Sequence, residues 1–249
     1  MSKLKLPQII GHRGCAAYAP ENTLESIHTA ADMDIKWVEL DVKLTKDQVP
    51  VIFHDDSLER TTNGHGLVAD TTYDDLKHLE AGSWFSESFG GVKIPTLEEA
   101  IDVLLDRDLG LNLEIKPCPG RETETAEVAL DVLSHYWDDH ERLLISSFSR
   151  EAMEAAHDMA EDWYRGFLMP KEWPDDWAEF AEHIQASTLH MEGNECTEEQ
   201  VHLALELGRP VLAFTINDPI RARLLQSWGI NTIFSDAPDV IEDGILTVH

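Results

Sequence analysis

The sequence predicts an α/β fold, a (β/α)8 TIM barrel that carries a small insertion after its second strand. Short apolar runs alternate with amphipathic helical segments along all 249 residues, which is typical of βα units around a parallel sheet. The strand pattern recurs eight times, as in a closed barrel. An open doubly wound sheet is the alternative, but no Gly-x-Gly-x-x-Gly turn supports it. We therefore expect a single barrel domain over residues 1–249, with residues 55–95 inserted as a lid or subdomain.

The expected elements follow from runs of apolar residues and from helix-capping signals. Strands are expected at residues 8–12, 37–43, 111–116, 143–147, 164–169, 184–189, 210–215 and 232–235. Helices are expected after Asn22 and Thr96 and near residues 73–79, 122–136, 150–161, 175–182, 197–207 and 219–228. Asn22 with Glu25, and Thr96 with Glu99, have the spacing of a capping box, so each pair is expected to begin a helix.

The second predicted strand is followed by a turn that is too short for a parallel connection. Residues 45–49 separate it from the apolar run 51–53, whereas parallel neighbours need a crossover of about a dozen residues or more. We therefore expect the run to double back as a hairpin and to return His54 to the rim where the second strand ends. Residues 55–95 then form an excursion longer than a plain βα loop needs.

Composition and charge exclude several classes of partner. The net charge is −29, from 48 acidic and 19 basic residues, so nucleic acid and anionic membranes are not expected partners. Either solubility or adaptation to high salt would explain this charge. Three widely spaced cysteines fit neither a disulfide framework nor a zinc knuckle. We do not expect the start of the chain to act as a signal peptide, and no apolar run reaches about 18 residues, so we expect a cytoplasmic protein.

Carboxylates recur on one face of two predicted strands. Residues two apart on a strand share a face, so Glu39 and Asp41 point one way. An edge strand with its polar face in solvent would carry the same pattern, but paired carboxylates in an apolar setting indicate a metal between them. On the third strand Glu114 and Lys116 face the interior, where they form either a structural salt bridge or a third metal ligand and a cation for the substrate. Three oxygen ligands favour Mg²⁺ or Ca²⁺, or Mn²⁺, over zinc.

His12 and Arg13 lie at the end of the first predicted strand, between two glycines. Glycine lets the backbone approach a ligand closely, an imidazole transfers protons near neutral pH, and a guanidinium can bind phosphate with two hydrogen bonds. His54 is expected at the same rim. Other histidines, such as His28 and His202, lie in predicted helices and are interpreted as surface or packing residues.

Several short motifs occur in a fixed order along the chain. They are His12-Arg13-Gly14, Pro20-Glu21-Asn22-Thr23, Glu39-Leu40-Asp41-Val42, His54-Asp55, Leu58-Glu59-Arg60-Thr61-Thr62-Asn63-Gly64, Ile94-Pro95-Thr96-Leu97, Leu113-Glu114-Ile115-Lys116 and Ser235-Asp236-Ala237-Pro238. Together they resemble the glycerophosphodiester phosphodiesterase family over nearly the whole chain. Two departures, Cys15 after the first motif and Phe214 where many members carry Trp, concern the leaving group rather than hydrolysis.

The resemblance implies a barrel with an inserted subdomain and a set of site residues. It implies a divalent cation on Glu39, Asp41 and Glu114. It also implies an acid/base pair at His12 and His54, and it matches Arg13 and Lys116 to positions that hold the phosphate.

The expected function is metal-dependent hydrolysis of a small glycerophosphodiester to sn-glycerol 3-phosphate and an alcohol. A cation, Arg13 and Lys116 would act where negative charge develops, while one histidine takes a proton from the attacking oxygen and the other protonates the departing alcohol. The attacking oxygen belongs either to water or to the glycerol itself. The alternatives are a lysophospholipase D-like phosphodiesterase and a barrel that binds phosphodiesters without turnover.

Overall fold

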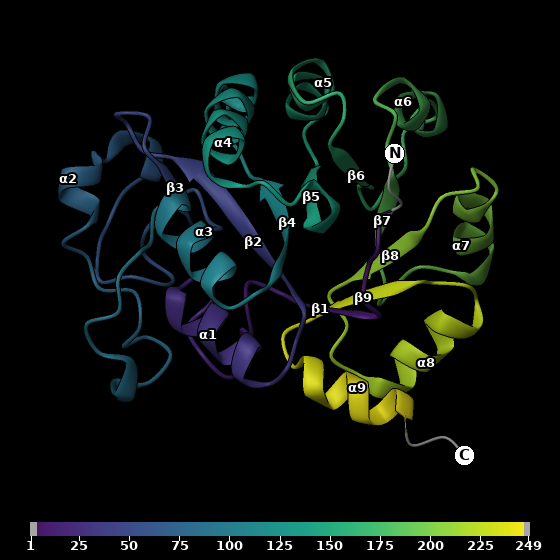
Figure 1. Ribbon diagram of the computed structural model, residues 1–249, viewed down its shortest axis with the longest axis horizontal. Coiled ribbons are helices and arrows are strands. Elements are labelled where there is room, and N and C mark those ends of the chain that lie inside the picture. The colour runs from purple at the N-terminus through teal and green to yellow at the C-terminus, as the bar shows by residue number, and fades with distance from the viewer. Residues whose placement is uncertain (1–3, 247–249) are drawn as a thin grey trace.

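The computed structural model, which describes residues 4–246, contains a closed parallel barrel with helices on its outside (Figure 1). Its strands are β1 Ile9–Gly11, β2 Trp37–Leu44, β4 Gly110–Ile115, β5 Leu143–Ser147, β6 Tyr164–Leu168, β7 Thr188–Glu192, β8 Val211–Phe214 and β9 Thr232–Ser235. The strand order is β1-β9-β8-β7-β6-β5-β4-β2, and a further pairing of β1 with β2 closes the ring. The predicted (β/α)8 barrel is thus confirmed.

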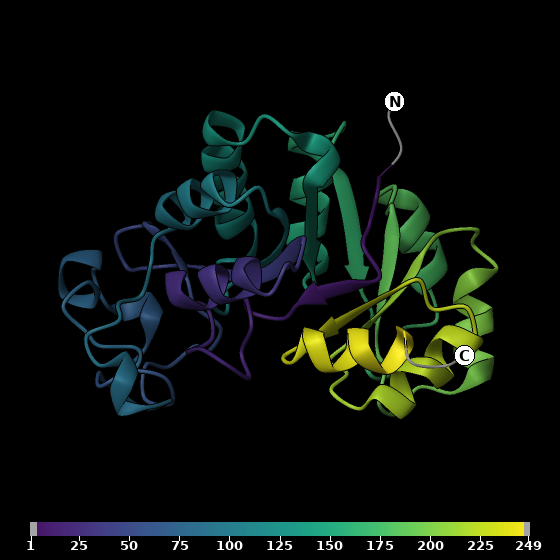
Figure 2. The same ribbon diagram turned by 60° about the horizontal axis from the view of Figure 1, so that its bottom comes forward.

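Helices follow the strands and cover the outer face of the barrel (Figure 2). They are α1 Leu24–Asp32, α3 Leu97–Asp106, α4 Glu122–Tyr136, α5 Arg150–Met159, α6 Trp177–His183, α7 Glu198–Leu205, α8 Pro219–Ser227 and α9 Pro238–Leu246. The last of these was not predicted, because the sequence interpretation ended at the turn after the eighth strand. No helix within residues 4–246 is long and apolar enough to cross a membrane.

Side-chain alternation in the barrel strands separates two layers of packing. Val38, Leu40 and Val42 of β2 are fully buried in the cluster that the strands share with the helices. The opposite face of β2 points into the barrel, where Trp37 belongs to a second cluster. Burial of each large apolar side chain stabilises the fold by roughly 1.5–3 kcal/mol. The polar residues of β2 and β4 near the C-terminal rim of the barrel are therefore held on rigid strands.

The segment after β2 forms the predicted hairpin, and residues 55–95, between β3 and α3, are here called the inserted segment. β3 Pro50–Ile52 runs antiparallel to β2, with Val42 opposite Ile52, and the chain then leaves the barrel at the left of Figure 1. The inserted segment contains η1 Val68–Asp70, α2 Tyr73–Leu76 and η2 Glu87–Phe89. A small core forms between this segment, β3 and the chain after β4, and it is made by Val51, Phe53, Leu58, Val68, Leu76, Ala81, Ile94 and Cys118.

Two local predictions were wrong. The N-cap of α1 is Thr23, which forms a capping box with Ser26, whereas Asn22 was predicted to cap this helix with Glu25. Asn22 instead has a left-handed φ of 57° and directs its side chain into the barrel rim. The sixth strand was predicted at residues 184–189 but β7 begins at Thr188, because α6 extends to His183 and Gln185 has a φ of 49°, which is incompatible with a strand.

Candidate active site

Three carboxylates converge at the C-terminal rim of the barrel, two from β2 and one from β4. The two strands pair in register, so Asp41 lies beside Glu114 and Glu39 lies beside Asn112. Oxygen atoms of Glu39, Asp41 and Glu114 lie within 4.8 Å of one another. Every residue of β2 is buried, so the alternative of an edge strand with a solvated polar face is wrong.

The electrostatics of the carboxylate cluster favour a bound cation. Burial raises the pKa of Glu39, and repulsion from Asp41 and Glu114 raises it further. Burial together with the charge of Asp41 raises the pKa of Glu114 to about 7. Burial alone would raise the pKa of Asp41 as well, but the positive charges of Arg13 and Lys116 lower it overall. Burial and repulsion thus disfavour the ionised forms of Glu39 and Glu114, and a cation bound between the carboxylates would offset both effects.

The donor set of the cluster fits a hard divalent ion. All three side chains offer oxygen, and Glu39 Oε1 is buried without a hydrogen-bond partner among the described residues. Carboxylate oxygens without nitrogen or sulfur donors suit Mg²⁺, Ca²⁺ or Mn²⁺ better than zinc. Glu39, Asp41 and Glu114 are therefore the residues of the described chain that could hold such an ion.

Arg13 and Lys116 border the carboxylate cluster. Lys116 Nζ lies 2.9 Å from Glu114 Oε1 and 3.8 Å from Asp41 Oδ1. Arg13 Nε lies 3.4 Å from Asp41 Oδ2, and the backbone N–H of Arg13 donates to Glu39 Oε2 at 2.9 Å. A tight turn places Arg13 there, with a φ of 49° at Arg13 and 88° at the following Gly14. Both predicted phosphate-binding cations thus reach the rim.

Each candidate histidine has an aspartate on its Nδ1 atom. His12 Nδ1 lies 2.6 Å from Asp236 Oδ1, and His54 Nδ1 lies 2.6 Å from Asp55 Oδ1. His12 Nε2 lies 3.9 Å from Glu39 Oε2, at the edge of the carboxylate cluster. Burial lowers the pKa of His54, although the charge of Asp41 opposes this shift. The hairpin returns His54 to the rim, where the charges of Asp41, Arg13 and Lys116 act on it. Because its pKa is lowered, the imidazole is neutral near pH 7 and can accept a proton.

Sequence reasoning missed several residues that hold the site together. The side chain of Asn22, which was expected to cap a helix, donates to Asp41 Oδ2 at 2.8 Å and accepts from the Asp41 backbone N–H at 3.1 Å. Asp236 and Asp55 orient the histidines, and Asp55 directly follows His54 in the sequence. That adjacency was a usable signal, whereas Asp236 is 224 residues away from His12 along the chain.

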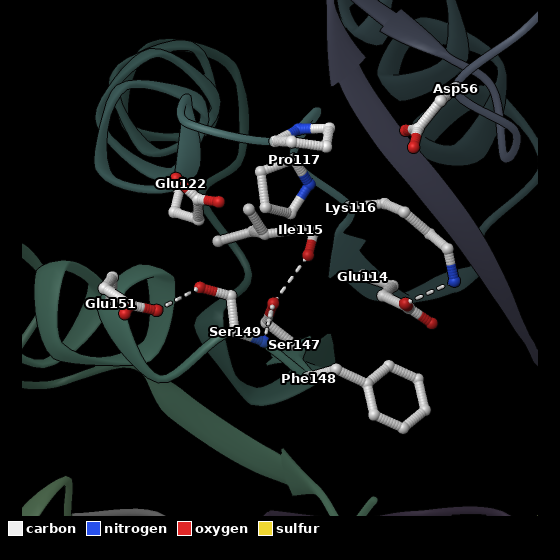
Figure 3. A pocket seen from close by; sticks show the side chains of 11 residues that line it. Asp56, Glu114, Ile115, Lys116, Pro117, Glu122, Ser147, Phe148, Ser149 and Glu151 are labelled. Atoms are coloured by element: carbon white, nitrogen blue, oxygen red, sulfur yellow. Dashed lines mark hydrogen bonds and ion pairs between the residues drawn. The ribbon is translucent and has the colours of Figure 1, made fainter.

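A groove opens beside the carboxylate cluster, between the segments that follow β4 and β5 (Figure 3). It has a volume of about 450 Å³, and Glu114 and Lys116 form part of its wall. Phe148 lines it, and the Phe148 ring centre is 5.6 Å from Lys116 Nζ. Glu122 and Glu151 lie on the opposite side in Figure 3. The groove is large enough for a small organic group attached to a phosphate at the rim.

Comparison with known proteins identifies the family. The family model for the glycerophosphoryl diester phosphodiesterase family matches residues 12–240. The chain belongs to this family. Two relatives of this family member are the glycerophosphodiester phosphodiesterases of Caldanaerobacter subterraneus subsp. tengcongensis and Bacillus altitudinis. The first is 32% identical over 237 residues, with 94% of this chain and 95% of the relative covered. The second is 32% identical over 242 residues, with 94% and 96% covered.

A solved structure agrees with this assignment. The fold of this family member is similar to that of a phosphodiesterase from Oleispira antarctica, with a TM-score of 0.92 and 44% sequence identity over 96% of this chain and 97% of that one. The Oleispira protein was solved in complex with the product sn-glycerol-3-phosphate. The predicted family is confirmed, and with it the enzyme class, the phosphoric diester hydrolases.

Proposed function

We propose that this family member hydrolyses glycerophosphodiesters to sn-glycerol 3-phosphate and an alcohol, using one divalent cation and two histidines. The observation that carries the proposal is the meeting of three buried carboxylates with two cations and two aspartate-bound imidazoles at one barrel rim. The product bound to the Oleispira relative supports the choice of substrate.

Glu39, Asp41 and Glu114 would hold the cation, for which Mg²⁺ and Ca²⁺ are the best candidates and Mn²⁺ also fits. When bound, the ion supplies positive charge that stabilises the oxygens of the phosphate as negative charge builds up in the transition state. Arg13 and Lys116 add to this stabilisation as hydrogen-bond donors, because each side chain lies against the carboxylate cluster.

His12 and His54 would move the protons of the reaction through their Nε2 atoms. An ionised aspartate on Nδ1 accepts the ring proton there, so Nε2 is the atom left to exchange protons with the substrate. One imidazole takes the proton of the attacking oxygen and the other donates a proton to the oxygen of the departing alcohol. Each such transfer contributes roughly 10²–10⁴-fold to the rate.

The groove beside Glu114 and Lys116 would receive the alcohol half of the substrate. It begins at these two residues, and its far wall lies on the segments that follow β4 and β5. A substituent on the phosphate can therefore extend from the rim into the groove without displacing the strands.

Choline release from glycerophosphocholine, measured with and without EDTA, tests the proposed function. We expect EDTA to abolish turnover and Mg²⁺, Ca²⁺ or Mn²⁺ to restore it. His12→Ala and His54→Ala should each lower kcat by at least ~10²-fold. His202→Ala, which changes an exposed histidine of α7, is the matched control and should turn over normally.

Three results would count against the proposal at different points. Unaffected turnover in EDTA would show that the reaction needs no cation. Unaffected turnover in the histidine variants would show that His12 and His54 do not transfer protons in the reaction. A wild-type protein that releases no alcohol from any glycerophosphodiester, with each of the three metals present, refutes the substrate class itself.

A further inference from the structure

Arg60 of the inserted segment bridges two carboxylates with its whole guanidinium group. Its Nε and Nη2 atoms donate to Asp55 Oδ2 and Oδ1 at 2.6 and 2.8 Å. Its Nη1 and Nη2 atoms donate to Glu21 Oε2 and Oε1 at 2.8 and 2.7 Å. Two paired hydrogen bonds of this kind define the orientation of both carboxylates as well as their distance.

Both carboxylates also bind a residue of the proposed active site. Asp55 Oδ1 lies 2.6 Å from His54 Nδ1, and Glu21 Oε1 accepts from Arg13 Nη1 at 2.6 Å. The same oxygen atoms, Asp55 Oδ1 and Glu21 Oε1, therefore accept from Arg60 as well. One guanidinium thus joins a candidate proton-transfer residue to a candidate phosphate-binding residue.

We propose that Arg60 is a positioning residue that holds His54 and Arg13 at a fixed separation across the phosphate site. The inference rests on the proposed function, because it assigns the two residues their roles there. Arg60 lies nearer the surface than the two residues it would position. Its side chain is 44% exposed, whereas those of Arg13 and His54 are 16% and 25% exposed. The inserted segment thereby contributes to the reaction without supplying a group that touches the phosphate.

Removal of Arg60 would leave two carboxylates facing each other without the charge between them. In the intact protein, burial would raise the pKa of Glu21, but the hydrogen bond from Arg60 and the charge of Arg13 lower it overall. Without Arg60, each carboxylate loses its two hydrogen bonds on that side, and Asp55 and Glu21 are free to turn away from His54 and Arg13. A displacement of about 1 Å in a reacting or binding group can cost on the order of 10²-fold in rate.

The chain offers a matched control at the other end of the barrel. Arg142 also bridges two carboxylates, with Nη1 2.6 Å from Asp108 Oδ1 and Nε 2.7 Å from Asp139 Oδ2. Its side chain is 34% exposed, similar to Arg60. Arg142 and Asp108 precede β5 and β4 respectively, so they lie where these strands begin, away from the proposed site at the strand ends. Arg142→Ala removes the same charge and a bridge between two carboxylates, with one hydrogen bond to each carboxylate instead of two.

The test compares Arg60→Ala, Arg60→Lys and Arg142→Ala with the wild-type protein at saturating metal. We would measure kcat and KM for glycerophosphocholine, affinity for sn-glycerol 3-phosphate by calorimetry, and melting temperature. Arg60→Ala should lower kcat by about 10- to 100-fold and weaken product binding, with a melting temperature close to that of Arg142→Ala. Arg142→Ala should keep wild-type kcat and product affinity.

Arg60→Lys separates bridging from charge. Lysine keeps the positive charge but lacks the planar fork that grips two carboxylates, so this variant should stay impaired. It also serves if Arg60→Ala does not fold. Wild-type kcat and product affinity in Arg60→Lys, or in a folded Arg60→Ala, would overturn the proposal. If the wild-type protein hydrolyses no glycerophosphodiester, the proposed function fails instead, and the two failures are thus distinguishable.

Discussion

Asp236 sets the orientation of His12. Its Oδ1 atom lies 2.6 Å from His12 Nδ1, and Asn217 Nδ2 donates to its Oδ2 at 2.7 Å. Burial would raise the pKa of Asp236, but its hydrogen bond with His12 lowers it overall. An ionised carboxylate fixed in this way keeps the ring proton of His12 on Nδ1 and turns Nε2 towards the carboxylate cluster.

Asp236→Asn should lower kcat by about 10²-fold, in the range expected for loss of acid–base catalysis, with a smaller change in KM. The amide group of asparagine can donate to Nδ1, which would move the ring proton to Nε2. Asp239→Asn is the control, because Asp239 accepts from the Tyr18 hydroxyl at 2.7 Å instead of orienting a histidine. Steady-state kinetics of both variants decide the matter: equal kcat values would show that Asp236 does not act through His12.

The predicted site residues could be found from the sequence because strand geometry fixes where they point. Alternation by two residues directs Glu39 and Asp41 to one face of their strand, and the same rule directs Glu114 inward from the next barrel strand. In the sequence, Arg60 and Glu21 stand out only as members of two separate motifs. The hydrogen bonds between them join loops that are 39 residues apart. No local periodicity reports such a contact, so the Arg60 bridge emerges only from the tertiary fold.

At the scale of elements, the capping pattern predicted the start of α3 correctly, where one capping pair was available. It predicted the cap of α1 wrongly, where two neighbouring residues could both cap the helix. Thr96 and Glu99 cap α3 as predicted, with Glu99 N–H donating to Thr96 Oγ1 at 3.2 Å and Thr96 N–H to Glu99 Oε2 at 2.8 Å. At α1, both Asn22 and Thr23 are good capping residues. The side chain of Asn22 donates to Asp41 in the tertiary structure, and Thr23 caps the helix. The sequence around the helix start does not report this contact.

Thr96→Ala should reduce the free energy of unfolding by about 1 kcal/mol, because the first turn of α3 loses a hydrogen-bond acceptor for its N–H groups. The kcat of the variant should not change, since Thr96 is not one of the residues assigned to the proposed site. Thr96→Ser keeps the hydroxyl and serves as the control. Urea denaturation of the three proteins gives the comparison, and a serine variant as unstable as the alanine variant would show that the cap is not the cause.

At the scale of the whole molecule, the dominant feature is charge. The chain carries a net charge of −29, and many of its acidic residues lie on exposed helix faces, such as Glu127 and Asp131 of α4. Their mutual repulsion opposes the compact state in dilute buffer. Salt weakens this repulsion, because the screening length falls from about 10 Å at 0.1 M to about 3 Å at 1 M.

The melting temperature should therefore rise between low and molar KCl. Replacement of Glu127 and Asp131 by lysine should make the rise smaller, because it lowers the charge density on α4 without touching the proposed site. Differential scanning calorimetry over a KCl series measures both effects. A melting temperature independent of KCl would exclude the high-salt interpretation and leave solubility as the reason for the acidic surface.

The distribution of the proposed site along the chain has a consequence for how specificity can change. The seven residues assigned to the cation, the phosphate and the protons all lie between His12 and Lys116. The later strands close the barrel, and Phe148 and Glu151, which border the groove, follow β5. Part of the groove that would recognise the variable alcohol thus lies in a different stretch of sequence from the residues assigned to bond cleavage. Grafting of the segment that follows β5 would therefore give new substrate preferences while the seven assigned residues are inherited intact.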